Sequence, residues 1–165
     1  MCGGYKITDW KKNSDGVRNL EQAISLLARN GITVPEDVRV AIYDELDPDV
    51  LASYLLPHES PADARYSWEN LLNDFGQVPI KVRSTVFESD EQIIAVLGHE
   101  LYELGLLRRH LEENETISAG QMSSLIATNT TSKNFHCLAS QYGDRAVLKF
   151  RGQNRDSYES TGSTC

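Results

Sequence analysis

The segment from Asp90 to Glu113 constrains the fold of this chain more than any other part of the sequence. Ser89 supplies an N-cap, and Asp90 and Glu91 place negative charge in the first turn, where the helix dipole favours it. At about 100° per residue, one face of this helix is apolar and much of the remaining surface is apolar as well. The apolar positions include Ile93, Ala95, Val96, Leu97, Leu101, Tyr102, Leu104, Leu106 and Leu111. A helix that is apolar nearly all round is buried, so the sequence predicts a central helix covered on several sides.

Shorter patterns on both sides of this helix predict a small sheet and further helices. Alternating apolar positions predict strands over 38–43 and 79–87. Apolar residues at helical spacing predict helices over 20–30, 67–75, 118–128 and from 132 onward. The first of these helices follows a cap at Ser14-Asp15. A short helical turn is expected over 51–56. Residues 146–150 fit either the last helix or a strand. The predicted fold class is α+β, with a small sheet packed against a central buried helix and further helices in the C-terminal half.

The length of 165 residues fits a single domain. We expect an irregular arm over 1–13, one α+β domain over 14–151 and a disordered tail over 152–165, which is rich in Ser, Thr and Gly. No apolar run approaches the ~18 residues of a membrane span, and the first residues lack the apolar core of a secretory signal. Three cysteines predict no disulfide framework, and Cys137 is expected to be an unreactive thiol. The sequence therefore predicts no membrane partner and a cytoplasmic protein, or one secreted as part of a larger effector.

The acidic charge is concentrated in one region of the chain. The formal net charge is −8, and residues 31–75 alone carry ten acidic and two basic side chains. Proteins that bind nucleic acid broadly show a basic stripe that neutralises phosphates, so that class is not expected here. The acidic region could instead dock a basic protein partner.

Three ionisable residues, His99, Glu100 and Glu103, occupy or adjoin the remaining stripe of the central helix. His99 and Glu103 are four residues apart and therefore lie above one another on one face. Burying such groups without partners costs several kcal/mol, so they need each other, a further partner or a metal ion. The alternative is a solvated polar stripe on an amphipathic helix, extended by Gln92 and His110.

The run His99-Glu100-Leu101-Tyr102-Glu103 resembles the helix of zincin peptidases, in which His-Glu-x-x-His holds zinc and the Glu is the general base. This chain has a carboxylate where the second His of that pattern stands, and Arg109 occupies the third-ligand position of the extended metzincin pattern. The resemblance implies a zinc cofactor with His99 as a ligand and Glu100 as the catalytic base. It leaves open whether Glu103 is a ligand or orients His99.

His136 is the natural third group for this site. It lies near the start of the last predicted helix, which can fold back over the central helix and bring His136 to His99 and Glu103. With these three ligands and Glu100, we expect a metal-dependent, peptidase-like hydrolase. The layout of strand, helix and later His also resembles toxin domains of bacterial polymorphic secretion systems. That resemblance implies an effector delivered into a competing cell.

Two other functions fit the same residues. In a metal-independent toxin RNase, His99 and His136 would serve as general acid and base, assisted by Glu103 or Arg145. A non-catalytic adaptor or immunity-type protein would instead bind a basic partner through residues 31–75. Activity on RNA that survives a chelator would distinguish the RNase from a metal enzyme. In the non-catalytic protein, substitution of His99 would leave function unchanged.

Overall fold

The computed structural model describes residues 9–54, 64–128 and 133–153. It contains the following elements in chain order: α1 (Leu20–Arg29), β1 (Val38–Ile42), β2 (Ala52–Tyr54), β3 (Arg65–Tyr66), α2 (Trp68–Leu71), β4 (Val78–Val82), the 3₁₀ helix η1 (Ser84–Glu88), α3 (Asp90–Asn114), β5 (Ile117–Ser118), α4 (Ala119–Ile126) and α5 (Phe135–Gln153). The predicted α+β fold class is confirmed.

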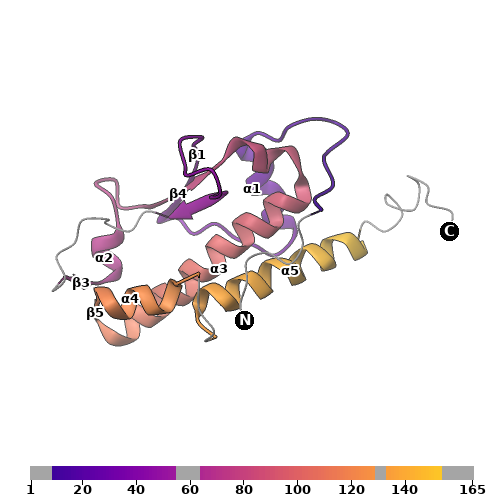
Figure 1. Cartoon of the computed structure of the whole chain (residues 1–165). Coiled ribbons are helices and arrows are strands. Elements are labelled where there is room, and N and C mark those ends of the chain that lie inside the picture. Colours follow the sequence, from indigo (N-terminus) through magenta and orange to yellow (C-terminus); the bar gives the residue numbers. More distant parts are fainter. Residues whose placement is uncertain (1–8, 55–63, 129–132, 154–165) are drawn as a thin grey trace.

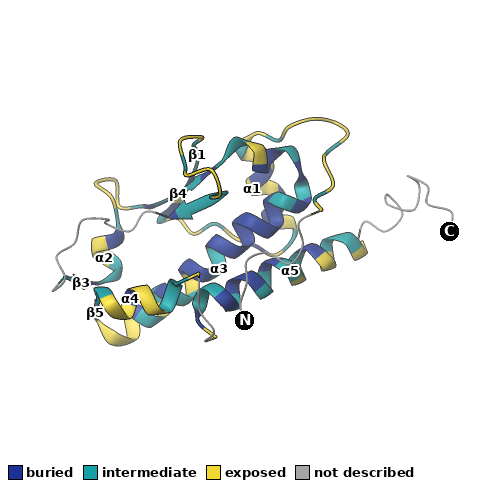
Figure 2. Cartoon of the chain, in the orientation of Figure 1, coloured by how far each residue is buried: buried dark blue, intermediate teal, exposed yellow. Residues whose placement is uncertain are grey.

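Helix α3 is the middle layer of the molecule. In Figure 1 the strands β1 and β4 lie above α3, and α5 runs below it. Eight consecutive residues of α3, 93–100, are buried, and Figure 2 shows this part of the helix in dark blue. Ser89 caps the helix by accepting a hydrogen bond from the backbone N–H of Gln92. The predicted central buried helix is thus present, with its predicted cap.

The main sheet has three strands in the order β1-β4-β2. Strand β4 lies in the middle, parallel to β1 and antiparallel to β2. Its residues Val78, Ile80 and Val82 are fully buried, as the alternating pattern predicts. A second sheet of two short strands pairs β3 with β5. Because β2 packs on α3 as well as on β4, the sheet holds residues 52–54 next to the middle of the helix.

Helix α5 returns antiparallel along α3. The ring of Phe135 lies 5.8 Å from the ring of His110 near one end, and Arg151 bonds Glu91 near the other. Between them, a Cβ on Gly143 would stand 2.8 Å from the backbone oxygen of Ala95, closer than real Cβ atoms come. Glycine at 143 therefore permits the close approach of the two helices. This approach brings the start of α5 over the middle of α3.

Several local predictions are wrong at particular residues. A helical turn was predicted over 51–56, but residues 52–54 form strand β2, because pairing with β4 overrides the local helical preference, and residues 55 and 56 lie outside the described residues. The predicted strand over 79–87 ends at Val82 and continues as η1, and the predicted helix over 67–75 ends at Leu71. The cap of α1 is Asn19, which forms a capping box with Gln22, and not Ser14-Asp15.

The last helix is continuous to Gln153, so residues 146–150 are helical and not a strand. Most of the predicted arm over 1–13 and of the predicted tail over 152–165 lies outside the described residues. Within the described ranges, no helix is both long enough and apolar enough to cross a membrane.

Candidate metal centre

The three ionisable residues in the middle of α3 are buried. His99, Glu100 and Glu103 are 2%, 7% and 5% exposed. The interpretation of these residues as a solvated stripe is therefore wrong. Each must be satisfied by groups of the protein or by a ligand, because an isolated buried charge is strongly unfavourable.

The close packing of α5 brings His136 to this point. Oε2 of Glu103 lies 3.1 Å from Nε2 of His99 and 3.2 Å from Nδ1 of His136. The two imidazole rings meet edge to face, with centroids 4.7 Å apart. One potential ligand atom from each of the three residues lies within 4.8 Å of the other two. The three residues predicted as metal ligands are thus neighbours in the folded chain.

Two further residues, which were not predicted from the sequence, contact this cluster. The hydroxyl of Tyr54 lies 2.5 Å from Oε1 of Glu103, in a bond between residues 49 positions apart. Oγ of Ser140 lies 3.4 Å from Nδ1 of His99 and donates to the backbone oxygen of His136 at 3.0 Å. Because Ser140 donates its only hydroxyl hydrogen to that carbonyl, its Oγ can accept a hydrogen bond from Nδ1 of His99. In the absence of a metal, Nε2 of His99 faces Oε2 of Glu103 as a donor, and with Nδ1 held by Ser140 it could instead present its lone pair to a bound ion.

The two buried carboxyls differ in their electrostatics. Burial acts to raise the pKa of Glu103, but hydrogen bonds from His136, His99 and Tyr54 outweigh it and bring the pKa to about 2. Burial, and secondarily the charge of Glu103, raises the pKa of Glu100 well above its usual range. Within the described part of the chain, no hydrogen bond reaches the Glu100 carboxyl. Glu103 is therefore the fixed anion of the cluster, and Glu100 is a carboxyl that readily holds a proton.

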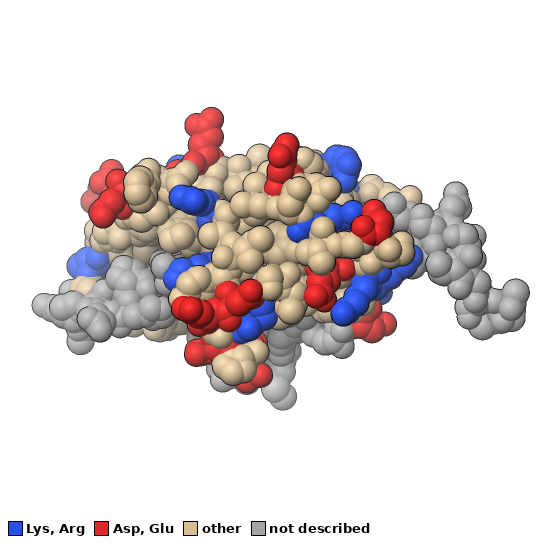
Figure 3. Space-filling view, turned by 90° about the horizontal axis from the view of Figure 1, so that it is seen from above, with Lys and Arg blue, Asp and Glu red and all other residues tan. Residues whose placement is uncertain are grey.

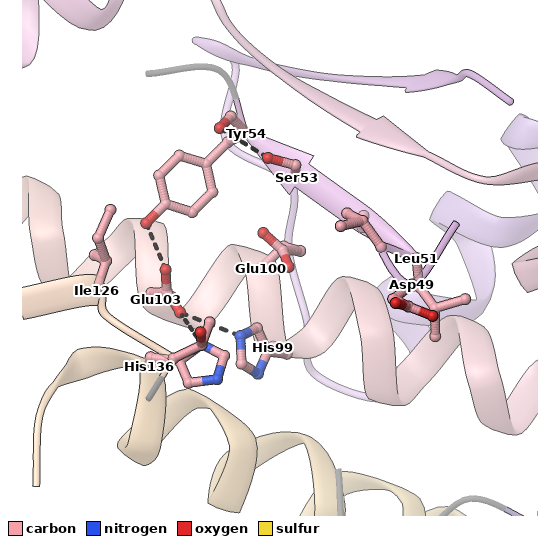
Figure 4. Close-up of a pocket in the computed structure, with 12 residues that line it drawn as sticks. Asp49, Leu51, Ser53, Tyr54, His99, Glu100, Glu103, Ile126 and His136 are labelled. Atoms are coloured by element: carbon pink, nitrogen blue, oxygen red, sulfur yellow. Dashed lines mark hydrogen bonds and ion pairs between the residues drawn. The ribbon is translucent and has the colours of Figure 1, made fainter. Parts of the chain in front are cut away.

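The cluster opens into a cavity of about 410 Å³. Residues 49–54, which lead into and form β2, make one wall, and Ile126, Thr128 and His136 make the other. Figure 4 shows the Glu100 carboxyl between β2 and α3, with Glu103 and the two histidines beside it. A small molecule or an extended chain entering this cavity meets Glu100 and the histidine cluster together.

The donor set fits a zinc ion. Two imidazole nitrogens and one carboxylate oxygen form an accepted shell for catalytic zinc, which keeps a fourth position open. Tetrahedral ligands at about 2.0–2.1 Å from zinc are about 3.3 Å from each other. The separations of 3.1 and 3.2 Å from Oε2 of Glu103 to the two histidines are close to this value. His99, Glu103 and His136 are the residues that would hold the ion.

Other residues considered in the sequence analysis lie away from the cluster. Arg145 is exposed on α5 and does not line the cavity, and Arg109 is exposed on α3. His110 is half-buried beside Phe135. Cys137 is buried as expected but is disulfide-bonded, so the prediction of an unreactive thiol there is wrong.

The chain matches no protein-family model, no curated protein sequence and no solved structure. The resemblances to zincin peptidases and to secreted toxin domains therefore stay predictions from the sequence.

Proposed function

We propose that this chain is a metal-dependent hydrolase that cleaves peptide bonds, with zinc held by His99, Glu103 and His136. The observation that carries the proposal is the position of Glu100. It lies on the same helix as two of the three ligand candidates and lines the same cavity as all three. A buried acid–base group beside a group of potential metal ligands is the arrangement that metal-assisted hydrolysis requires.

A zinc ion bound there would polarise a substrate carbonyl and lower the pKa of water. The protein supplies the proton transfers. Glu100 accepts a proton from the attacking water and returns it to the leaving amine. Burial raises the pKa of Glu100, which makes it a stronger proton acceptor than an exposed carboxylate. Glu103 and the two histidines have neighbours that fix their orientation, so they stay in place while the proton moves.

Strand β2 supports a peptide as the substrate. It has one neighbour, β4, in the three-stranded sheet of the described residues, and its own residues line the cavity. An extended peptide can add to a strand edge through backbone hydrogen bonds, which bind any sequence in an extended form. A peptide lying along β2 would pass directly over Glu100.

The loop before β2 favours peptides with basic side chains. Asp49 lines the cavity, and the same loop carries Asp44, Glu45 and Asp47. The guanidinium of Arg83 donates to the backbone oxygens of Leu46 and Asp47 at 2.9 and 2.7 Å, which fixes the loop at the rim of the site. Elsewhere on the face in Figure 3, acidic and basic side chains are interspersed without a continuous basic stripe. We therefore propose that the acidic loop attracts the basic side chains of a peptide substrate.

The test is hydrolysis of a mixed peptide library by the full chain with and without zinc. We expect cleavage that a chelator abolishes and zinc restores, with basic residues enriched near the cleaved bonds. Activity on RNA that survives the chelator would contradict the proposal and support the acid–base pair of His99 and His136. No hydrolysis of any substrate, together with loss of binding to basic proteins when Asp44, Asp47 and Asp49 are neutralised, would favour the non-catalytic alternative.

A further inference from the structure

We infer that Tyr54 is a positioning residue that makes Glu103 a monodentate metal ligand, which binds through one carboxylate oxygen. This inference deepens the proposed function and rests on it. Its basis is the division of the two oxygens of Glu103 between two kinds of partner. Oε1 receives the hydroxyl of Tyr54, and Oε2 faces both histidines.

The position of the Tyr54 hydroxyl is fixed by the fold. Tyr54 is the last residue of β2 and pairs with Ile80 of the central strand, so its backbone is held by the sheet. Its side chain is buried against α3. A phenol has few rotatable bonds, and its hydroxyl lies in the plane of the ring. The donor points at Glu103, as Figure 4 shows.

This hydrogen bond decides how Glu103 can bind a cation. A carboxylate with both oxygens free can chelate a metal ion through both, which fills an extra coordination position. A short O–H···O bond occupies one lone pair of Oε1 and withdraws part of its negative charge, which leaves Oε2 as the stronger ligand atom. A catalytic zinc site needs an open coordination position for its substrate. Monodentate coordination by Glu103 keeps that position open.

The contact also orients the carboxylate between the two histidines. Hydrogen-bond partners behind a metal ligand fix its orientation, and their loss typically lowers metal affinity about 10–100-fold. Ser140 has the equivalent place behind His99. Tyr54 is the more informative residue to test, because Tyr→Phe removes one oxygen atom and keeps the buried ring.

Tyr43 offers a matched control. It lies directly after β1, which belongs to the same sheet as β2. Its hydroxyl donates to Oε2 of Glu45 at 3.1 Å. This is the same kind of Tyr–Glu bond at an exposed position, and neither residue lines the cavity. Tyr43→Phe therefore reproduces the chemical change away from the cluster.

The experiment is a Co²⁺ titration of metal-free full chain, comparing wild type, Tyr54→Phe and Tyr43→Phe. Visible absorption reports the coordination number, because four-coordinate Co²⁺ absorbs more strongly than five- or six-coordinate Co²⁺. Competition with a chelating dye gives Kd, and thermal melts establish that both variants are folded. We expect Tyr54→Phe to weaken Co²⁺ binding about 10–100-fold and to reduce the visible absorption per bound ion. Tyr43→Phe should match wild type in both respects.

The outcomes separate this inference from the proposed function. Tight Co²⁺ binding by wild type, with the same Kd and spectrum for Tyr54→Phe, would overturn the inference and leave the metal site standing. No Co²⁺ binding by wild type would overturn both. A weaker Kd with an unchanged spectrum would also contradict the inference, because it would show that Tyr54 does not set how Glu103 coordinates.

Discussion

Helix α3 carries two buried clusters around carboxylates, and they are satisfied in different ways. Near the N-terminus of the helix, Glu91 is 2% exposed and is met by a permanent cation. Nε and Nη2 of Arg151 donate to its two oxygens at 3.0 and 2.8 Å, and the backbone N–H of Lys11 adds a third bond at 3.1 Å. This cluster ties the N-terminal segment, α3 and α5 together.

In the middle of the helix, Glu103 is met by two histidines and a tyrosine, none of which carries a permanent charge. Glu100 lies beside them with a raised pKa, and both carboxyls line the cavity. Burial of a carboxylate therefore does not by itself indicate function. The informative combination is a buried carboxylate whose partners are potential metal ligands and whose position faces a cavity.

The largest effect is expected from Glu100→Gln. This variant removes the proton acceptor but keeps the shape of the side chain, so hydrolysis of a peptide should fall about 10²–10⁴-fold while zinc still binds. Steady-state rates and zinc affinity measure the two properties separately. Glu113→Gln, an exposed change on the same helix, is the control and should leave both unchanged. Full activity of Glu100→Gln would remove the distinction between the two clusters.

The reverse pattern is expected when the Glu91 cluster is broken. Arg151→Ala leaves the Glu91 charge buried without its cation, which should lower the free energy of unfolding by about 3 kcal/mol. Zinc affinity of the folded protein should stay the same. Urea denaturation and zinc titration test this, with Arg145→Ala as an exposed control on the same helix. Weak zinc binding in a folded Arg151→Ala protein would show that the two clusters are coupled.

Gly143 lies between the two clusters along α5, and its substitution should affect both regions. The Cβ of Gly143→Ala would collide with the backbone oxygen of Ala95 and push α5 away from α3. We expect a loss of about 1–3 kcal/mol in stability and about tenfold in zinc affinity, because His136 moves with the helix. At Gly105, on α3, an added Cβ meets nothing within 4 Å. Gly105→Ala should therefore be neutral or stabilising, and equal behaviour of the two alanine variants would refute this account of the packing.

The smallest expected effect is on the pH dependence of stability in the metal-free protein. The pKa of Glu100 is raised on folding, so the folded state keeps a proton that the unfolded chain releases above its own pKa of about 4.3. The free energy of unfolding contributed by this group therefore falls as pH rises from about 4.3 to the folded pKa. Glu100→Gln removes that loss, so its stability relative to wild type should increase from about pH 4 to about pH 7. Urea denaturation at both pH values measures the change, and an equal difference at the two values would contradict it.

The sequence was sufficient to predict the centre of the fold. The cap at Ser89 and the apolar surface of the following helix are local signals, and α3 begins where they predict. His136 could also be related to His99, because α5 is long and amphipathic enough to pack along a buried helix. The position of Ser140 near the cluster could also have been predicted from helical spacing. It stands four residues after His136 and thus on the same helical face.

Tyr54 could not be found in this way. The segment that contains Tyr54 was predicted as a helical turn. Residues 52–54 form a strand only because β4, more than twenty residues later, pairs with them. The Tyr54–Glu103 bond follows from that non-local pairing. The close approach at Gly143 is another case, because a glycine in a helix shows where a backbone can approach but not which backbone does.

The most direct test of the central claim is the zinc content of purified protein, measured by plasma emission for wild type, His99→Ala, His136→Ala and His110→Ala. The account predicts about one zinc per chain in wild type and in His110→Ala, whose imidazole lies outside the cluster, and essentially none in the other two variants. Absence of zinc from wild type, even after incubation with the metal, would contradict the account. So would equal zinc content in all four proteins.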